Sequence, residues 1–195
     1  FDSVQAEGAG TIAKAATAAG ASKLVHVSAI GADPDSESLY AQSKAAGEAA
    51  VKAAFPTATI MRPSVVFGPE DDFFNRFANL ARLSPVLPLI DGGHTKMQPV
   101  YVGDVADAIC KALVDDACAG ETYELGGPRI LTMKEIMEYT LAEAGMKRLL
   151  LPLPSAIAAI QASLLELLPT PPLTRDQLKL LAHDNVVSDG AKSFA

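Results

Sequence analysis

Clustered positive charge, cysteine pairs and long apolar runs are all missing from this sequence. Its 195 residues carry a formal net charge of −7, and lysines and arginines nowhere form a run. Since phosphate backbones are bound by clustered cations, nucleic acid is not expected as a partner. No apolar run approaches the roughly 20 residues that a bilayer-spanning helix requires, so no transmembrane span is expected either.

Few residues are available for metal or disulfide chemistry. The two cysteines, Cys110 and Cys118, form neither a disulfide framework nor a metal-binding pattern. Cys110 and Leu113 fall in one helical pattern and are both expected to be buried. The three histidines are scattered along the chain, so no metal site is expected. What remains is 49% hydrophobic and 20% charged residues, the composition of a folded globular protein.

A tyrosine and a lysine open an alanine-rich helical stretch. Tyr40 and Lys44 are four residues apart, so a helix that starts near Tyr40 would present the phenol and the ammonium on one face. A phenol with a pKa of about 10 is a poor acid or base at neutral pH. A neighbouring ammonium stabilises the phenolate, and we therefore expect Lys44 to lower the pKa of Tyr40. An ordinary pair on the surface of a helix is the alternative.

Helical and strand-like segments alternate along the chain, which predicts an α/β fold. A short apolar strand, 24–28, ends at Ser28, and a second strand, 57–61, is expected to end at Arg62-Pro63. Ligands bind beyond the carboxyl ends of strands in such sheets, so Ser28 and the loop 63–68 are candidate site residues. The other predicted strands are 86–90, 99–102 and 122–125, and the predicted helices are 4–19, 39–54, 72–83, 104–114, 132–144, 155–168 and 174–183.

One dinucleotide-binding fingerprint near the start of the chain is interpreted as a chance match. Gly8, Gly10 and Ala13 fit the pattern G-x-G-x-x-A, but that motif acts only where it follows a strand and opens a helix. Residues 1–7 are not strand-like, and the helical pattern continues through both glycines. The glycines are therefore expected to permit close packing and not to hold a phosphate.

Four segments in order resemble the extended short-chain dehydrogenase/reductases, in their epimerase/dehydratase branch: LVHVS, YAQSK, MRPSVVFGP, and PVYVGDVADAI followed by YELGG. Three longer phrases, HVSAIGAD, FFNRFANLARLSPVLPLI and QPVYVGDVADAI, resemble the atypical group typified by the nucleotide-binding accessory subunit of respiratory complex I and its bacterial relatives. A bacterial source is expected on this basis. The resemblance implies the C-terminal part of a Rossmann-type, doubly wound parallel sheet with a smaller, mostly helical lobe.

The resemblance also implies a division of labour within the chain. Residues 1–68 and 98–128 would form part of an NAD(P)-binding domain, and residues 69–97 and 129–195 a lobe for substrate or partner. In this family the glycine-rich phosphate loop lies well upstream of the segment where this chain starts. We therefore expect an N-terminally truncated fragment that is inactive alone.

The same resemblance implies a site for NAD or NADP. Tyr40 would transfer the proton, and Lys44 would bind the nicotinamide ribose. The residues implied to contact the cofactor are Ser28, Tyr40, Lys44, Pro63, Ser64, Val65 and Val66. Two departures weaken catalysis and sugar-nucleotide binding. Ile30 occupies the position of the usual catalytic serine or threonine, and Met97 that of an arginine that binds diphosphate.

Two functions remain open. The first is an NAD(P)-binding module with weak or no catalysis, linked to respiratory complex I or quinone metabolism and located in the cytoplasm or peripherally at the inner membrane. The second is an active NAD(P)-dependent oxidoreductase or epimerase with Tyr40 as its acid/base. The apolar segment 155–168 has two interpretations as well: packing within the substrate-binding lobe, or a docking surface for complex subunits or a hydrophobic substrate such as a quinone.

Overall fold

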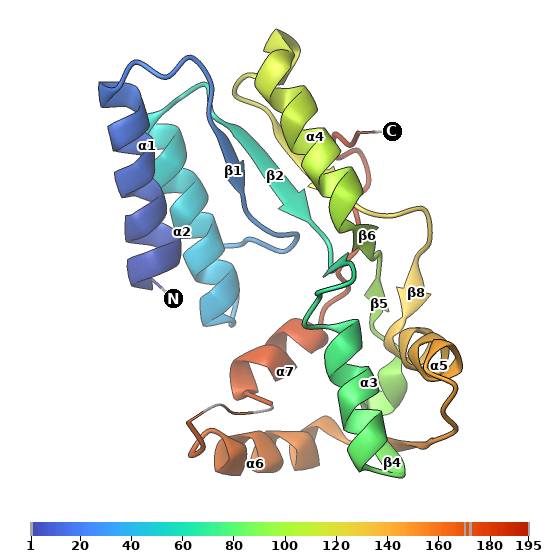
Figure 1. Cartoon of the computed structure of the whole chain (residues 1–195). Coiled ribbons are helices and arrows are strands. Elements are labelled where there is room, and N and C mark those ends of the chain that lie inside the picture. Colours follow the sequence, from blue (N-terminus) through green and yellow to red (C-terminus); the bar gives the residue numbers. More distant parts are fainter. Residues whose placement is uncertain (1, 170, 172, 195) are drawn as a thin grey trace.

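The computed structural model describes residues 2–169, 171 and 173–194. The chain forms two parts, and a parallel sheet lies at the centre of one of them. Its strands lie in the order β1 (Val25–Val27), β2 (Thr59–Pro63) and β7 (Thr122–Leu125), and both pairings are parallel (Figure 1). Helices α1 (Ala9–Ala18) and α2 (Leu39–Ala54) lie on one face, and α4 (Val102–Val114) lies on the other. The expected α/β class with a parallel sheet is confirmed.

Adjacent residues of β2 show that both faces of the sheet are covered. Ile60 and Met61 are each 0% exposed, and they point to opposite faces because side chains alternate along a strand. Ile60 packs with Val51 of α2, and Met61 packs with Val105 of α4. A strand buried on both faces is mostly apolar, and the buried Thr59 at its start donates its hydroxyl to the Cys118 carbonyl at 2.7 Å.

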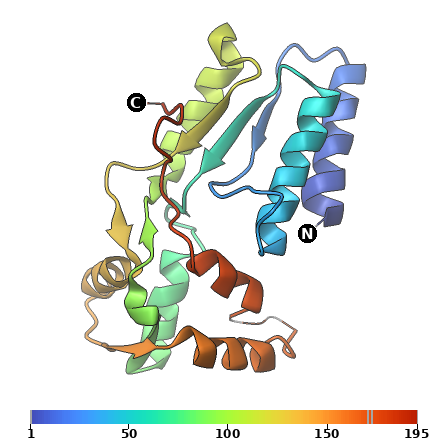
Figure 2. The same cartoon turned by 180° about the vertical axis from the view of Figure 1, so that it is seen from behind.

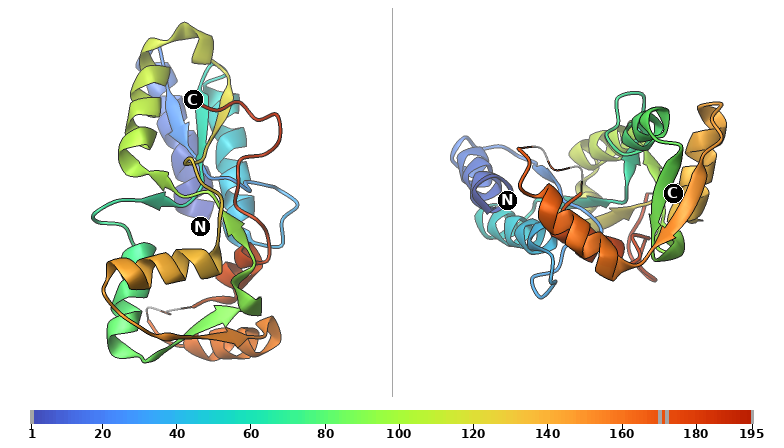
Figure 3. Two further views of the ribbon diagram at one scale, coloured as in Figure 1. Left: turned by 90° about the vertical axis from the view of Figure 1, so that its right-hand side faces the viewer. Right: turned by 90° about the horizontal axis from the view of Figure 1, so that it is seen from below.

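The second part consists mainly of helices packed on short strands (Figure 3). Its core contains the Ala81 side chain of α3 (Phe74–Leu83) and leucine, methionine and isoleucine side chains of β4 (Val86–Ile90), β5 (Lys96–Met97) and α5 (Met133–Glu143). Met97 belongs to this core and is 5% exposed, so it has a packing role. The elements of this part and of the connection are β3 (Val66–Phe67), α3 (Phe74–Leu83), β4 (Val86–Ile90), η2 (Asp91–Gly93), β5 (Lys96–Met97), β6 (Val100–Tyr101), β8 (Leu131–Thr132), α5 (Met133–Glu143), β9 (Leu149–Leu153), α6 (Ser155–Leu165) and α7 (Arg175–Leu181).

The last described residues return to the sheet. After α7 the chain runs back along β7 (Figure 2), where the Glu124 N–H donates to the Lys192 carbonyl at 2.9 Å. Phe194 lies against Tyr123, with 4.4 Å between the ring centroids. This segment covers the edge of β7 that faces away from β2, so residues far apart in the sequence complete the sheet.

The N-terminal helix begins differently from the prediction. The expected helix 4–19 consists of a π-helical stretch, η1 (Asp2–Gly8), followed by α1. A β-carbon at Gly10 would meet the Ala50 side chain at 3.0 Å, and one at Gly47 would meet the Gln5 carbonyl oxygen at 2.3 Å. Helical structure therefore continues through Gly8 and Gly10, and the interpretation of Gly10 as a close-packing residue is confirmed.

Two further predictions are wrong. The strand expected to begin at residue 57 begins at Thr59; its end at Pro63 agrees with the prediction that Arg62-Pro63 ends it, and the Pro63 carbonyl accepts the Ile30 N–H at 3.0 Å. Cys110 and Leu113 of α4 are exposed, since the buried face of that helix consists of Val105 and alanines at helical spacing. The buried cysteine is Cys118.

Helix α6 exposes its largest apolar side chains. Its buried residues are Ala158 and Ala162, each 0% exposed. Leu164 is 65% exposed and Leu168 is 50% exposed, so the packed interpretation of 155–168 is wrong for these two leucines. We call the exposed apolar side chains of this region the α6 face: Ile157, Ile160, Leu164, Leu167 and Leu168. Across the described ranges, no helix is both long and apolar enough to cross a membrane.

The chain is expected to self-associate through β1. Among the described residues, no strand pairs with the edge of β1 that faces away from β2, and Val27 is 42% exposed. Unpaired backbone groups at a sheet edge invite pairing with a second chain, and a lysine there opposes it. Sedimentation velocity at micromolar concentration should show oligomers that Val27→Lys reduces and Val114→Lys, at an exposed position on α4, does not. A monomer with cooperative unfolding would contradict this expectation.

Candidate functional site

The predicted Tyr40–Lys44 pair lies in the first turns of α2. Ser38 has an extended backbone (φ −84°, ψ 124°), and its hydroxyl accepts the Ala41 N–H at 3.3 Å, so it is the N-cap that makes the helix begin at Leu39. Lys44 Nζ lies 5.7 Å from the centroid of the Tyr40 ring. Helical spacing thus brings the phenol and the ammonium together, as the sequence predicts.

The electrostatic consequence differs from the prediction. Burial raises the pKa of the Tyr40 phenol, because removing water disfavours the charged phenolate. Burial also lowers the pKa of the Lys44 ammonium, and the Glu48 carboxylate partly opposes this shift. The expected lowering of the Tyr40 pKa by Lys44 is therefore wrong for this structure, since desolvation of the phenol is the larger effect. The phenol stays protonated at neutral pH, so it can donate a proton but is a poor base.

The predicted residues at the strand ends lie side by side. The Ser28 N–H donates to the Met61 carbonyl at 2.7 Å, and the Ser64 N–H donates to the Leu125 carbonyl at 2.9 Å. Ser28 is 3% exposed, and its hydroxyl has no hydrogen-bond partner among the described residues. It nevertheless lies near enough to the Glu48 carboxylate to help lower the pKa of that group. A buried hydroxyl in this position suits a polar ligand at the carboxyl end of the sheet.

Ile30 and the two valines occupy the loops beyond these strands. Ile30 is 8% exposed, and its alkyl side chain offers no hydrogen bond. The Val65 carbonyl accepts the Val100 N–H at 2.9 Å, and Val66 pairs with Val100 in the parallel β3–β6 ladder. Both valines are half-buried and are held by their backbones. Backbone hydrogen bonds to β6 therefore fix the position of both valines beyond the end of β2.

Ser64 is held by a residue that the sequence did not suggest. Its hydroxyl lies 2.6 Å from Asn185 Oδ1 and 2.9 Å from the Asn185 carbonyl. The Asn185 side-chain amide also reaches the Ile30 carbonyl, at 3.4 Å. Asn185 follows α7 and stands 121 residues from Ser64, so no local pattern could have indicated its role.

A partly buried charge network adjoins Ser28 through Glu48. Arg62 donates two parallel hydrogen bonds to Glu48, each 2.8 Å long, and lies 3.8 Å from Glu124. Burial alone would raise the pKa of Glu48, but the Arg62 hydrogen bonds and charge hold it below its usual range. Glu124 in turn accepts the Ser188 N–H at 2.8 Å. The network ties α2, β2, β7 and the C-terminal segment together. An arginine within a buried strand is the sequence signal that could have indicated this network.

Lys44 borders a concavity of about 720 Å³ between η1, α1 and β1. His26 of β1 lies in the same concavity; burial and the Lys44 charge lower its pKa, and the Glu48 charge partly opposes this. In the described part of the chain, no three histidine, cysteine, aspartate or glutamate side chains gather as metal ligands.

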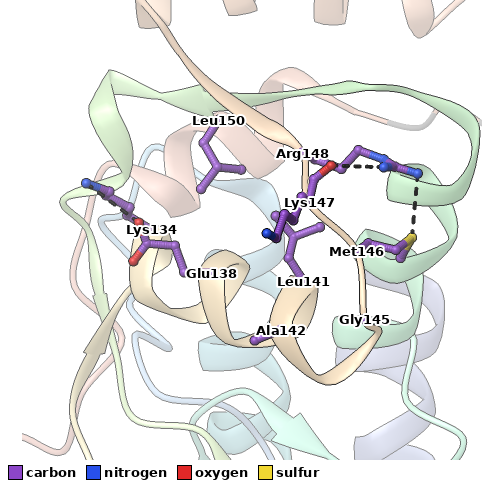
Figure 4. A pocket seen from close by; sticks show the side chains of 9 residues that line it. All are labelled: Lys134, Glu138, Leu141, Ala142, Gly145, Met146, Lys147, Arg148 and Leu150. Carbon is purple, nitrogen blue, oxygen red and sulfur yellow. Dashed lines mark hydrogen bonds and ion pairs between the residues drawn. The ribbon is translucent and has the colours of Figure 1, made fainter.

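A second concavity, of about 670 Å³, lies on α5 in the other part of the molecule (Figure 4). Arg148 at its rim donates to the Ala81 carbonyl at 2.6 Å and to the Lys147 carbonyl at 2.9 Å. Lys134 lies 3.8 Å from Glu138. Arg148 and Lys134 are thus both bound by groups of the protein itself, so we assign no ligand to this concavity.

Comparison with known proteins agrees with this geometry. A family model described as the RmlD substrate binding domain matches residues 2–167. The chain is 41% identical over 185 residues to the NADH dehydrogenase [ubiquinone] 1 alpha subcomplex subunit 9 of Arabidopsis thaliana, covering 90% of this chain and 46% of that protein. It is 35% identical over 195 residues to the NADH-ubiquinone oxidoreductase 40 kDa subunit of Neurospora crassa, covering 100% of this chain and 51% of that protein. The chain thus spans about half the length of these curated relatives, and a bacterial source is not confirmed because both are eukaryotic.

Solved structures show the same fold. The dTDP-glucose 4,6-dehydratase of Streptomyces venezuelae, solved with NAD, superposes with a TM-score of 0.68 at 24% identity, over 79% of this chain and 54% of that one. The dTDP-4-dehydrorhamnose reductase of Bacillus anthracis, solved with NADP, gives a TM-score of 0.66 at 24% identity, over 79% of this chain and 58% of that one. With its sheet, its Tyr40–Lys44 helix and these likenesses, the chain belongs to the RmlD substrate binding domain family and is an atypical extended short-chain dehydrogenase/reductase close to the complex I subunit group.

Proposed function

We propose that this chain belongs to an NAD(P)-binding module of a membrane respiratory complex, related to complex I or quinone metabolism, with weak or no catalysis. The observation that carries the proposal is the combination of a preserved Tyr40–Lys44 pair with Ile30 at the place of the usual hydroxyl donor. Ribose binding requires the lysine whether or not hydride is transferred. The two relatives are subunits of NADH dehydrogenase [ubiquinone] and of NADH-ubiquinone oxidoreductase, which supports the same assignment.

The cofactor assignment rests on the site residues at the sheet end. Lys44 would hold the nicotinamide ribose, and Ser28 together with residues 63–66 would line the ring; NAD or NADP is the cofactor, as in the structural neighbours. The cofactor would supply hydride chemistry. Residues 1–68 and 98–128 would form the cofactor-binding part, and residues 69–97 and 129–195 the part for substrate or partner.

Ile30 is the reason for assigning weak catalysis. A donor that stabilises the reacting oxygen is worth about 2.7–4 kcal/mol at such sites, and an alkyl side chain cannot supply it. The raised pKa of Tyr40 acts in the same direction, since a protonated phenol cannot accept a proton. The missing donor at Ile30 and the raised pKa of Tyr40 are both expected to slow proton transfer without weakening cofactor binding.

The α6 face is the proposed contact with the complex. It consists of five large, exposed apolar side chains on α6 and on the residues that directly follow it. Exposed apolar groups that gather in one place mark interaction surfaces. We assign an apolar surface of a neighbouring complex subunit as the occupant. On this proposal the protein would lie peripherally at the inner membrane.

Replacing Leu164 and Leu168 by glutamate is expected to abolish association with the complex while leaving folding nearly unchanged. Both side chains are at least half exposed, and exposed substitutions usually change stability by less than about 0.5 kcal/mol. The measurement is co-purification with respiratory membranes, together with thermal unfolding of the purified variant. Ala162→Glu, at a position that is 0% exposed, is the matched control and should fail to fold. Normal co-purification of the double variant with the membranes would overturn the docking assignment. A double variant that still co-purifies but no longer binds a quinone would indicate that the α6 face binds a hydrophobic substrate instead.

The second candidate is an active oxidoreductase or epimerase with Tyr40 as acid/base. It is favoured by the 5.7 Å approach of Lys44 to the Tyr40 ring, the arrangement that a working pair needs. Tyr40→Phe, treated in the Discussion, separates the two functions.

A further inference from the structure

The beginning of α2 has two caps, one of which comes from the far end of the chain. Ser38 provides the local cap through its hydroxyl. Asp176, the second residue of α7, provides the other: its Oδ1 accepts the Leu39 N–H at 2.7 Å, and its Oδ2 accepts the Tyr40 N–H at 3.3 Å. The same Oδ2 accepts the Ser38 hydroxyl at 2.9 Å. One carboxylate therefore binds three consecutive residues at the start of the helix.

The groups bound by Asp176 are those that the helix itself cannot satisfy. The first N–H groups of an α-helix have no carbonyl partner within the helix, so they need an external acceptor. An anionic acceptor is also favoured at this end by the helix dipole. Tyr40 is one of the residues bound, and Lys44 follows one turn later on the same helix. The carboxylate thus acts on the backbone that carries the proposed ribose-binding pair.

Asp176 is itself held in place by its neighbours. Thr174 caps α7 through a reciprocal pair of hydrogen bonds with Gln177. Arg175 binds the Glu166 carboxylate through its side chain and its backbone N–H, each at 2.8 Å. Lys179 Nζ donates to the Glu37 carbonyl at 2.9 Å, next to the start of α2. Figures 1 and 2 both show α7 below the end at which α2 begins.

We infer that Asp176 is a positioning residue that sets the orientation of the Tyr40–Lys44 pair at the start of α2. The inference rests on the proposed role of that pair in cofactor binding, and it assigns α7 a function besides packing. Asp176 touches neither the Tyr40 phenol nor the Lys44 amine in these hydrogen bonds. It acts through the backbone.

The test uses nuclear magnetic resonance of the chain with labelled tyrosine and lysine side chains. Asp176→Ala should accelerate amide hydrogen exchange at Leu39 and Tyr40 by about 10- to 100-fold, as expected for the loss of a hydrogen bond to a charged acceptor. The Tyr40 ring and Lys44 amine resonances should shift as well. Asp176→Asn keeps one acceptor oxygen, so it should retain protection at Leu39 and lose it at Tyr40.

Asp184→Ala is the matched control, since Asp184 also accepts a backbone N–H, that of Lys96 at 2.8 Å, but makes this contact in the other part of the molecule. It should leave the Tyr40 and Lys44 signals unchanged. Unchanged Tyr40 signals in both Asp176 variants, or equal changes in Asp184→Ala, would overturn the inference. If Asp176→Ala does not fold, the Asn variant decides.

Cofactor affinity separates this inference from the proposed function. In the longer protein that the resemblance implies, Asp176→Asn should weaken NADH binding several-fold, while Asp184→Ala should not. NADH affinity unchanged by Asp176→Asn would overturn the inference. A protein that binds no NADH at all would refute the proposed function, and the resonance measurement would then decide the role of Asp176 by itself.

Discussion

Replacing Arg62 by methionine is expected to lower the free energy of unfolding by about 3–5 kcal/mol, the cost of leaving a buried charge without its partner. The Glu48 side chain is only 7% exposed, and Arg62 binds it with two parallel hydrogen bonds of 2.8 Å. Without the guanidinium, the carboxylate must either remain charged in a poorly hydrated place or take up a proton. Urea denaturation at neutral pH measures the loss.

The contribution of Glu48 to the pH dependence of stability should have opposite signs in the parent and in Arg62→Met. In the parent chain the folded-state pKa of Glu48 lies below its usual value of 4.5, so its stabilising contribution is present above that value and is lost as the pH falls through the folded-state pKa. In Arg62→Met, burial is no longer opposed by the guanidinium, and the folded-state pKa should lie above the unfolded one. The deficit relative to the parent should therefore shrink as the pH falls towards 4.5.

Two variants serve as controls for Arg62→Met. Lys192→Met removes an exposed ion pair with Glu121, of 2.8 Å, and should cost less than about 1 kcal/mol. The double variant Glu48→Gln with Arg62→Met removes both charges and should recover part of the loss. A single Arg62→Met variant as stable as Lys192→Met would show that the network contributes little.

Tyr40→Phe is expected to abolish any hydride-transfer activity in the longer protein that the resemblance implies. General acid–base catalysis contributes about 10²- to 10⁴-fold, and phenylalanine removes the proton-transferring hydroxyl while keeping the ring. Cofactor affinity should remain nearly unchanged. Lys44→Ala should weaken cofactor binding as well, because it removes a charge-assisted contact to the ribose.

Steady-state kinetics and cofactor titration together separate the two proposed functions. Tyr139→Phe, at a position on α5 that is 53% exposed, is the matched control and should retain full turnover. An active parent that loses turnover in Tyr40→Phe alone would favour the enzyme. If Tyr40→Phe keeps full turnover, Tyr40 is not the acid/base. If the parent protein binds NADH but shows no turnover, the cofactor-binding module is favoured.

Local patterns were sufficient for much of the secondary structure and for one side-chain pair. The alternation of helices and strands indicated an α/β fold, and the structure shows a capping box between Thr132 and Glu135, three residues apart, at the start of α5. Tyr40 and Lys44 were expected to lie together, and they do. These predictions succeed because the interactions involved span only a few residues, where helix periodicity and capping geometry determine which groups meet.

The sequence by itself therefore determined the α/β class, the resemblance to short-chain dehydrogenases and the Tyr40–Lys44 spacing. Only the tertiary structure decided the sign of the Tyr40 pKa shift, the exposure of Leu164 and the partners of Ser64 and Ser38. Desolvation and exposure depend on what packs around a side chain, and Asn185 and Asp176 reach their partners across more than a hundred residues. Spacing along the chain carries no information about such contacts, because folding alone brings those segments together.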